Sequence, residues 1–153
     1  MGSEKAVENL IYKSCMLMAK QDFTGYLDLC DDKFHYLTTA HSPEIRKDMI
    51  WLEKDKSGMD ILFKQLPRHN SDHSPLTRHA TVYSVDYDEK AKQAAAITSV
   101  QIYRTDLDGG ATALFAVGKY YDKISFDGPK PRLLERNVRL DTRMLGMGYH
   151  IPL

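Results

Sequence analysis

The chain of 153 residues has the length of one ordinary domain, and we expect residues 1–153 to form a single one. Apolar residues make up 42 % of it and charged residues 27 %, a mix typical of a folded protein and not of a disordered one. Lysine plus arginine number 21, as do aspartate plus glutamate, so the formal net charge is zero. This balance argues against nucleic acid as the main partner, and it favours self-association or a partner subunit because copies repel one another little.

The number of cysteines and the hydropathy of the chain indicate the cellular compartment in which the protein lies. Cys15 and Cys30 are too few for a disulfide framework or a four-thiolate metal site. The first residues form no apolar signal region, and the longest mostly apolar run, 111–117, is far too short to span a bilayer. We therefore expect a cytoplasmic protein that does not associate with a membrane.

The first third of the sequence has helical spacing. Ser3 is suited to cap a first helix, and Asp22 to cap a second short one over 23–29. Residues 34–39 predict a short strand. Ser42-Pro43-Glu44 predicts another helix start, with a helix that includes 49–51, and a further helical segment covers about 59–66. The first helix would bury one stripe, formed by Val7, Leu10, Ile11, Ser14 and Met18.

The period changes after residue 66. Prolines, serines and histidines over 67–75 predict a loop. Strand-like runs with short breaks follow, and breaks this short join antiparallel neighbours. These runs cover 77–87, 93–106, 111–126 and 132–143. Helices followed by such a meander predict an α+β fold, with the N-terminal helices packed on one face of a curved antiparallel sheet.

Two of these runs, at 94–97 and 113–117, are apolar on both faces. One face must cover the helices, and the other needs a cover too because large apolar strips are seldom left in water. Either the sheet rolls up tightly and covers itself, or its outer face is a subunit interface. The interface residues that we predict are Ala95, Ile97, Leu114 and Ala116.

Tyr12 and Met16 are neighbours on the first helix, opposite its apolar stripe. One interpretation is that they are scattered surface residues, which need no explanation. The other is that they pack against a neighbouring subunit.

No motif for nucleophilic catalysis or for nucleotide binding occurs in the sequence, and neither cysteine has a histidine near it. Asp72, His73 and His79 have the side chains of a two-histidine, one-carboxylate iron site, but they fall in or next to the proline-rich loop, which favours a solvated loop or an interface. A cone of helices and sheet can hold an acid–base pocket, for which His35, His79 and Asp28 are candidates. The competing interpretation is that these are structural or surface side chains.

Arg136 stands out on the last predicted strand. It shares a face with Leu134, Val138 and Leu140, so alternation points it toward the helices. A buried arginine stays charged and needs a carboxylate or several carbonyl oxygens as partners. We expect a structural buried ion pair with an acidic residue of the helical half. The candidates are Asp28, Asp31 and Asp32. The alternative is an anion-binding arginine in an open cone.

Three stretches carry a resemblance to a known family. They are 115–124 (FAVGKYYDKI), 133–143 (LLERNVRLDTR) and the closing Ile151-Pro-Leu153. With Arg78-His79 at a strand start and 48–52, they resemble the small (β) subunit of Rieske non-haem iron ring-hydroxylating oxygenases. These are packing motifs rather than catalytic ones, and they extend over most of the chain.

The resemblance implies a nuclear-transport-factor-2-like cone and no cofactor on this chain. It places the Rieske 2Fe–2S cluster and the mononuclear iron on a large (α) subunit, with the small subunit as a trimer in an α3β3 assembly. It implies a non-catalytic, structural subunit of a monooxygenase or dioxygenase that receives electrons from NADH through partner proteins. The branch it resembles acts on small acids such as salicylate, terephthalate or methanesulfonate. A free-standing isomerase or dehydratase of the same fold is the alternative.

Overall fold

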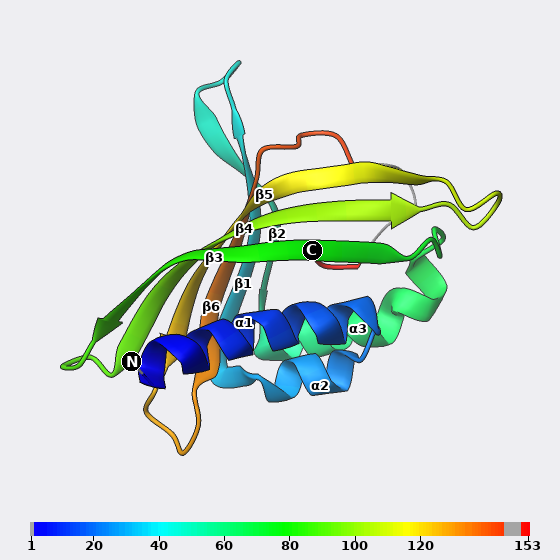
Figure 1. The fold of residues 1–153 in the computed structure, drawn as a ribbon. Helices are drawn as coiled ribbons and strands as arrows, with labels where there is room; N and C mark the ends of the chain where they lie inside the picture. The colour runs from blue at the N-terminus through cyan, green and yellow to red at the C-terminus, as the bar shows by residue number, and fades with distance from the viewer. Residues whose placement is uncertain (1, 146–150) are drawn as a thin grey trace.

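The computed structural model describes residues 2–145 and 151–153, in which helices pack on one face of a strongly curved sheet (Figure 1). The helices are α1 (Gly2–Ala19), α2 (Phe23–Asp28) and α3 (Lys56–His69). The strands are β1 (Cys30–Ser42), β2 (Lys47–Asp55), β3 (Leu76–Asp88), β4 (Gln93–Thr105), β5 (Thr112–Ser125) and β6 (Arg132–Leu140). The α+β class with helices before the meander is as predicted. Within the described residues, no helix is long and apolar enough to cross a membrane.

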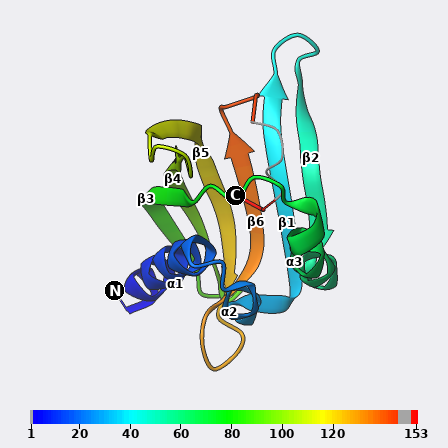
Figure 2. The same ribbon diagram turned by 90° about the vertical axis from the view of Figure 1, so that its right-hand side faces the viewer.

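The strand order is β2-β1-β6-β5-β4-β3. Neighbours are antiparallel except β1 and β6, which pair in parallel, so the predicted curved antiparallel sheet contains one parallel junction. Helix α1 packs along β3 at one edge, and α3 packs against β1 and β2 at the other. Figure 2 shows the β1–β2 hairpin extending beyond the helices, so that part of the sheet has no helix beneath it.

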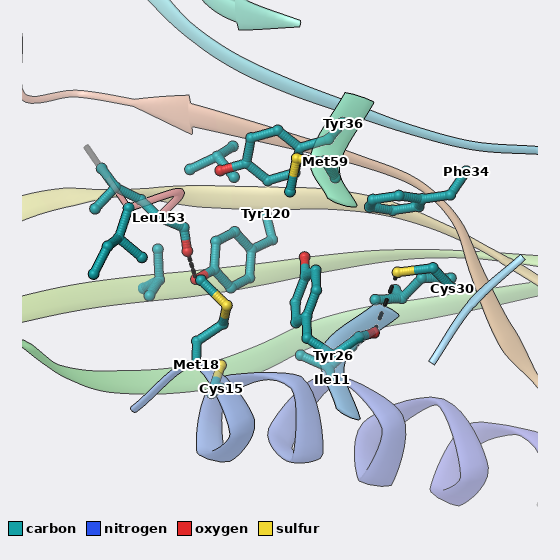
Figure 3. Close-up of a cluster of buried hydrophobic side chains, with 14 of the residues drawn as sticks. Ile11, Cys15, Met18, Tyr26, Cys30, Phe34, Tyr36, Met59, Tyr120 and Leu153 are labelled. Atoms are coloured by element: carbon teal, nitrogen blue, oxygen red, sulfur yellow. Dashed lines mark hydrogen bonds between the residues drawn. The ribbon is translucent and has the colours of Figure 1, made fainter. Parts of the chain in front are cut away.

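The hydrophobic core lies between the helices and the concave face of the sheet. Helix α1 contributes the predicted stripe, in which Val7 and Ile11 are fully buried. Phe34 and Tyr36 point inward from β1, and alternation turns the residue between them outward. Figure 3 shows this cluster, in which tyrosine rings and sulfur-containing side chains fill the cone.

Several predicted boundaries differ from the structure. The helix expected from Ser42 is instead a hairpin turn followed by β2, and Arg46 in that turn adopts φ 54°. The reason is that β1 runs on to Ser42 and pairs with β2, which satisfies backbone groups that a helix at 44–51 would leave exposed at the strand edge. Ser3 lies inside α1, one residue after its start.

Two further boundaries lie close to the loop and to α2. Helix α3 continues through Pro67 to His69, so the predicted loop begins only at Asn70. Because proline has no N–H, the helix runs through Pro67 without the backbone hydrogen bond that this position would otherwise donate. Asp22 caps α2 as predicted, since its carboxylate accepts a hydrogen bond from the Gly25 N–H at 2.9 Å.

Candidate functional site

The polar centre of the cone is an ion pair between Arg136 on β6 and Asp122 on β5, which stand opposite each other in the ladder. The guanidinium donates to both carboxylate oxygens, with Nε–Oδ1 2.8 Å and Nη2–Oδ2 2.9 Å. Its Nη1 donates to Ser14 Oγ at 2.9 Å, and Cζ lies 4.1 Å from the centre of the Tyr120 ring. Arg136 is 1 % exposed and Asp122 2 %. The buried charge is therefore matched by a bidentate partner on one side and a π face on the other.

The surroundings of this pair fix its protonation. Burial alone would lower the pKa of Arg136, but the Asp122 carboxylate outweighs it and holds that pKa well above its ordinary value. Burial raises the pKa of Tyr26 and of Tyr120 well above that of a free phenol. Tyr26 and Tyr120 therefore stay protonated and Arg136 stays charged near neutral pH, so none of the three is suited to act as a general base.

The partner of Arg136 differs from the one that the sequence suggested. It comes from the neighbouring strand. Of the three residues that we suggested, Asp28 is exposed at the end of α2, whereas Asp31 and Asp32 lie at the start of β1, half-buried and exposed. The sequence signal that would have found Asp122 is its position two residues after Tyr120 and two before Ile124, both inward-facing on β5. What the sequence lacked was the register that sets β5 against β6.

The segment Ile151–Leu153 packs against β3 and β5. The Leu153 carbonyl oxygen accepts hydrogen bonds from Tyr120 Oη at 2.7 Å and from Arg78 Nε at 3.3 Å, and the Pro152 carbonyl accepts one from Arg78 Nη2 at 3.1 Å. Ile151 and Leu153 are each 6 % exposed. In Figure 3, Leu153 lies beside the Tyr120 ring at the end of the core cluster. These contacts explain why Ile151-Pro-Leu153 belongs to the same set of packing motifs as 115–124.

The histidines and the aspartate named as acid–base candidates lie on separate surfaces. His35 points outward from β1, where its Nε2 lies 2.8 Å from Glu53 Oε2. His79 is exposed on β3, with its ring edge-on to Tyr103 at 5.4 Å between centroids. Asp28 is exposed at the end of α2. The structure does not bring them together, because strand alternation sends His35 away from the cone.

Asp72, the aspartate in the loop before β3, is held by hydrogen bonds. Asp72 accepts hydrogen bonds from the Ser74 N–H at 3.0 Å and from Arg104 Nε at 2.9 Å, and these lower its pKa. Among the residues that the structure describes, no three histidine, cysteine, aspartate or glutamate side chains lie close enough to hold a metal ion together.

The outer face of the sheet contains most of the residues that we assigned to an interface. Ala95 is exposed and Ile97 half-buried, and their ladder partners are Lys123 and Tyr121. Tyr121 is 39 % exposed and Leu114 is 55 % exposed. This set of Ala95, Ile97, Leu114 and Tyr121 is called the outer patch below.

Ala116 does not belong to the outer patch. It is 1 % exposed and points into the core opposite Ile102. The reason is a register shift between Ile102 and Tyr103, which places Leu114 opposite Tyr103 and breaks the alternation of β5 at this point. Leu114 and Ala116, which are two positions apart on β5, therefore face opposite sides of the sheet.

Tyr12 and Met16 lie on the exposed side of α1, at 39 % and 57 % exposure. The Tyr12 hydroxyl oxygen accepts a hydrogen bond from the Val82 N–H at 3.2 Å. The tyrosine therefore covers a backbone donor on the edge strand β3, a role that the sequence did not indicate.

Comparison with known proteins identifies the family. No family model matches the chain. The β subunit of methanesulfonate monooxygenase hydroxylase from Methylosulfonomonas methylovora is 38 % identical over 155 residues, which cover 97 % of this chain and 86 % of that protein. The β subunit of 2-aminobenzenesulfonate 2,3-dioxygenase from an Alcaligenes species is 31 % identical over 149 residues, 97 % of each chain. The chain belongs to the small (β) subunits of ring-hydroxylating oxygenases.

Solved structures of other proteins share the fold of this chain. A chain from Novosphingobium aromaticivorans, assigned as the β subunit of an aromatic-ring-hydroxylating dioxygenase, superposes with a TM-score of 0.80 at 17 % identity and covers 97 % of this chain and 95 % of its own. A second chain from that organism, assigned as a scytalone dehydratase, gives 0.65 at 10 % identity and covers 98 % and 89 %. The predicted nuclear-transport-factor-2-like cone is confirmed, and the same fold occurs in β subunits and in a dehydratase-like protein. Fold alone therefore does not decide function.

Proposed function

We propose that this β subunit is a non-catalytic, structural component of a Rieske-type oxygenase whose large (α) subunit performs the reaction and holds the Rieske cluster and the mononuclear iron. The observation that carries the proposal is what occupies the interior of the cone. Its polar centre is a fully buried, bidentate ion pair, and Leu153 accepts a hydrogen bond from the tyrosine that packs against this pair. The candidate groups for acid–base work lie apart on the surface. These features favour the structural role over a free-standing isomerase or dehydratase.

The substrate of the complex is proposed from the relatives. Both curated relatives belong to enzymes named for a sulfonate, one aliphatic and one aromatic. We propose that the complex hydroxylates an organosulfonate, with methanesulfonate as the first candidate. The contacts to substrate would then lie on the large subunit, which leaves this chain free of them. Its two free, buried cysteines, Cys15 and Cys30, suit the reducing cytoplasm, where we place the assembly.

A trimer within an α3β3 assembly is proposed for the outer patch. Its apolar side chains stand on the convex side of the sheet, opposite the face that the helices cover. Burying them against a second copy would remove apolar area from water at about 25 cal/mol per Å². The balanced net charge of the chain adds little repulsion to such contacts. Tyr12 and Met16 remain a predicted second contact.

Co-expression with the large subunit tests the structural role. We expect the two chains to copurify in equal amounts with iron–sulfur absorption, whereas the β subunit purified alone is colourless and turns over no sulfonate. Turnover by the isolated β subunit would contradict the proposal. So would a large subunit that is equally stable and active without it.

Sedimentation of the β subunit tests the trimer. Ala95→Glu places a charge in the outer patch and should convert a species of three 17.5 kDa chains into a folded monomer. Ala111→Glu, at an exposed alanine in the turn before β5, is the matched control and should leave the trimer intact. A wild-type chain that sediments as a monomer at high concentration would refute the interface.

A further inference from the structure

The segment Ile151–Leu153 lies in the cone as a bound ligand would. Its two aliphatic side chains are buried, and its carbonyl oxygens accept hydrogen bonds from framework groups on β3 and β5. Those donors are Arg78 and Tyr120, which are held by strands and not by the segment itself. The site that the segment occupies is therefore largely preformed.

The walls of the site have the composition of a small-molecule pocket. Beside the segment lies a cavity of about 250 Å³, with Leu145 and Ile151–Leu153 on one side and side chains of β1, β2 and α3 on the other. Trp51, Leu52 and Leu62 form this wall, with Thr38 as a polar member. Predominantly apolar walls with a few convergent hydrogen-bond donors are typical of ligand sites.

The two hydrogen-bond donors in the site, Tyr120 and Arg78, keep their protons. Tyr120 is packed against the Arg136 guanidinium, and burial raises its pKa, so its hydroxyl stays a donor. The arginine side chain of Arg78 cannot lose its charge. Both donors therefore select an acceptor oxygen, preferably one with negative charge, next to an aliphatic body.

We propose that the cone contains a binding site for a branched aliphatic group that carries a carbonyl or carboxylate oxygen, and that Ile151–Leu153 occupies this site in cis as a built-in competitor. The inference rests on residues of this chain and does not depend on the proposed function. The inference specifies what kind of ligand the cone would bind, whereas the structural role requires no ligand there.

Titration of the full-length chain with the peptide acetyl-Ile-Pro-Leu-amide tests the inference. Leu153→Asp puts a charge into an apolar site and should drive the segment out. We expect calorimetry to show saturable binding of one peptide per chain to this variant. The wild type should show none, because its tethered segment competes at an effective concentration of the order of millimolar or above. Adding Tyr120→Phe should weaken binding about three- to tenfold, since one hydrogen bond is lost.

Controls separate this result from nonspecific binding. Leu107→Asp, at a leucine that is 66 % exposed, should behave as the wild type, and acetyl-Ile-Pro-Asp-amide should not bind. Leu153→Ala is the milder variant and should bind the peptide more weakly than Leu153→Asp. Equal binding to wild type and variants would overturn the inference, as would a folded Leu153→Ala chain that does not bind at all. Copurification with the large subunit is measured in a separate experiment. The binding site can therefore be refuted without refuting the structural role, and the reverse also holds.

Discussion

Replacing Arg136 by methionine is the sharpest test of how the interior is held together. The methionine fills a similar volume but strands the Asp122 carboxylate, which is 2 % exposed and loses both of its bonds to the guanidinium. Breaking a buried pair from one side costs about 3–5 kcal/mol. A domain of ordinary stability has about 5–15 kcal/mol in total, so Arg136→Met should lose a large part of it.

Urea unfolding followed by circular dichroism measures this loss. The matched control is Arg139→Met on the same strand, where the arginine pairs with Asp48 on the exposed face at 2.9 Å. A surface pair of this kind is worth about 0–1 kcal/mol, so the control should stay near the wild type. The double replacement of Arg136 by Met and Asp122 by Leu should regain most of the stability, because no buried charge is left alone. If Arg136→Met unfolds at the wild-type urea concentration, the pair does not hold the interior.

Further predictions concern the core and its dependence on pH. Thr98→Val should stabilise the chain by about 1 kcal/mol in the same assay, because the Thr98 hydroxyl is buried without a hydrogen-bond partner among the described residues, and a loss of stability would contradict this. Gly118→Ala should destabilise by about 1–3 kcal/mol, since its Cβ would clash with the Arg139 backbone oxygen of β6, whereas Gly128→Ala meets nothing closer than 3.9 Å and should be near neutral. Stability should fall as pH rises from about 8.5 toward 12, because burial raises the pKa of Cys15 and raises that of Cys30 to about 12, while unfolded thiols lose their protons near 8.5. Replacing Cys30 by Ala should flatten that slope, and an unchanged slope would exclude the thiol as its cause.

Much of the fold could be predicted from periodicity alone. The stripe on α1, the Asp22 cap and the meander of β3 to β6 follow from patterns within single elements. Strand β2 could not be predicted in this way, because its four consecutive apolar residues, 49–52, have no period of either kind. Whether such a run forms a helix or a strand depends on a partner, and that partner is the unpaired edge of β1.

The site shows the same division between local and long-range information. Alternation within β6 was enough to bury Arg136, but naming Asp122 required the register between two strands. The position of Ala116 depended on a register shift, which composition does not reveal. The contact between Tyr120 and Leu153 joins residues 33 positions apart, and nothing in the intervening sequence indicates it.

The parallel pairing of β1 with β6 has a consequence for how the chain comes to be folded. Tyr36 and Arg136 are ladder partners one hundred positions apart, and every pair that joins these strands has a similar separation. Closing such a loop costs entropy before any contact is gained, so contacts of this kind slow folding. During synthesis, α1, α2 and the β1–β2 hairpin must wait with an exposed sheet edge until β6 has been made. We therefore expect this half of the molecule to be the one that engages chaperones, and the last strand to be the step that releases it.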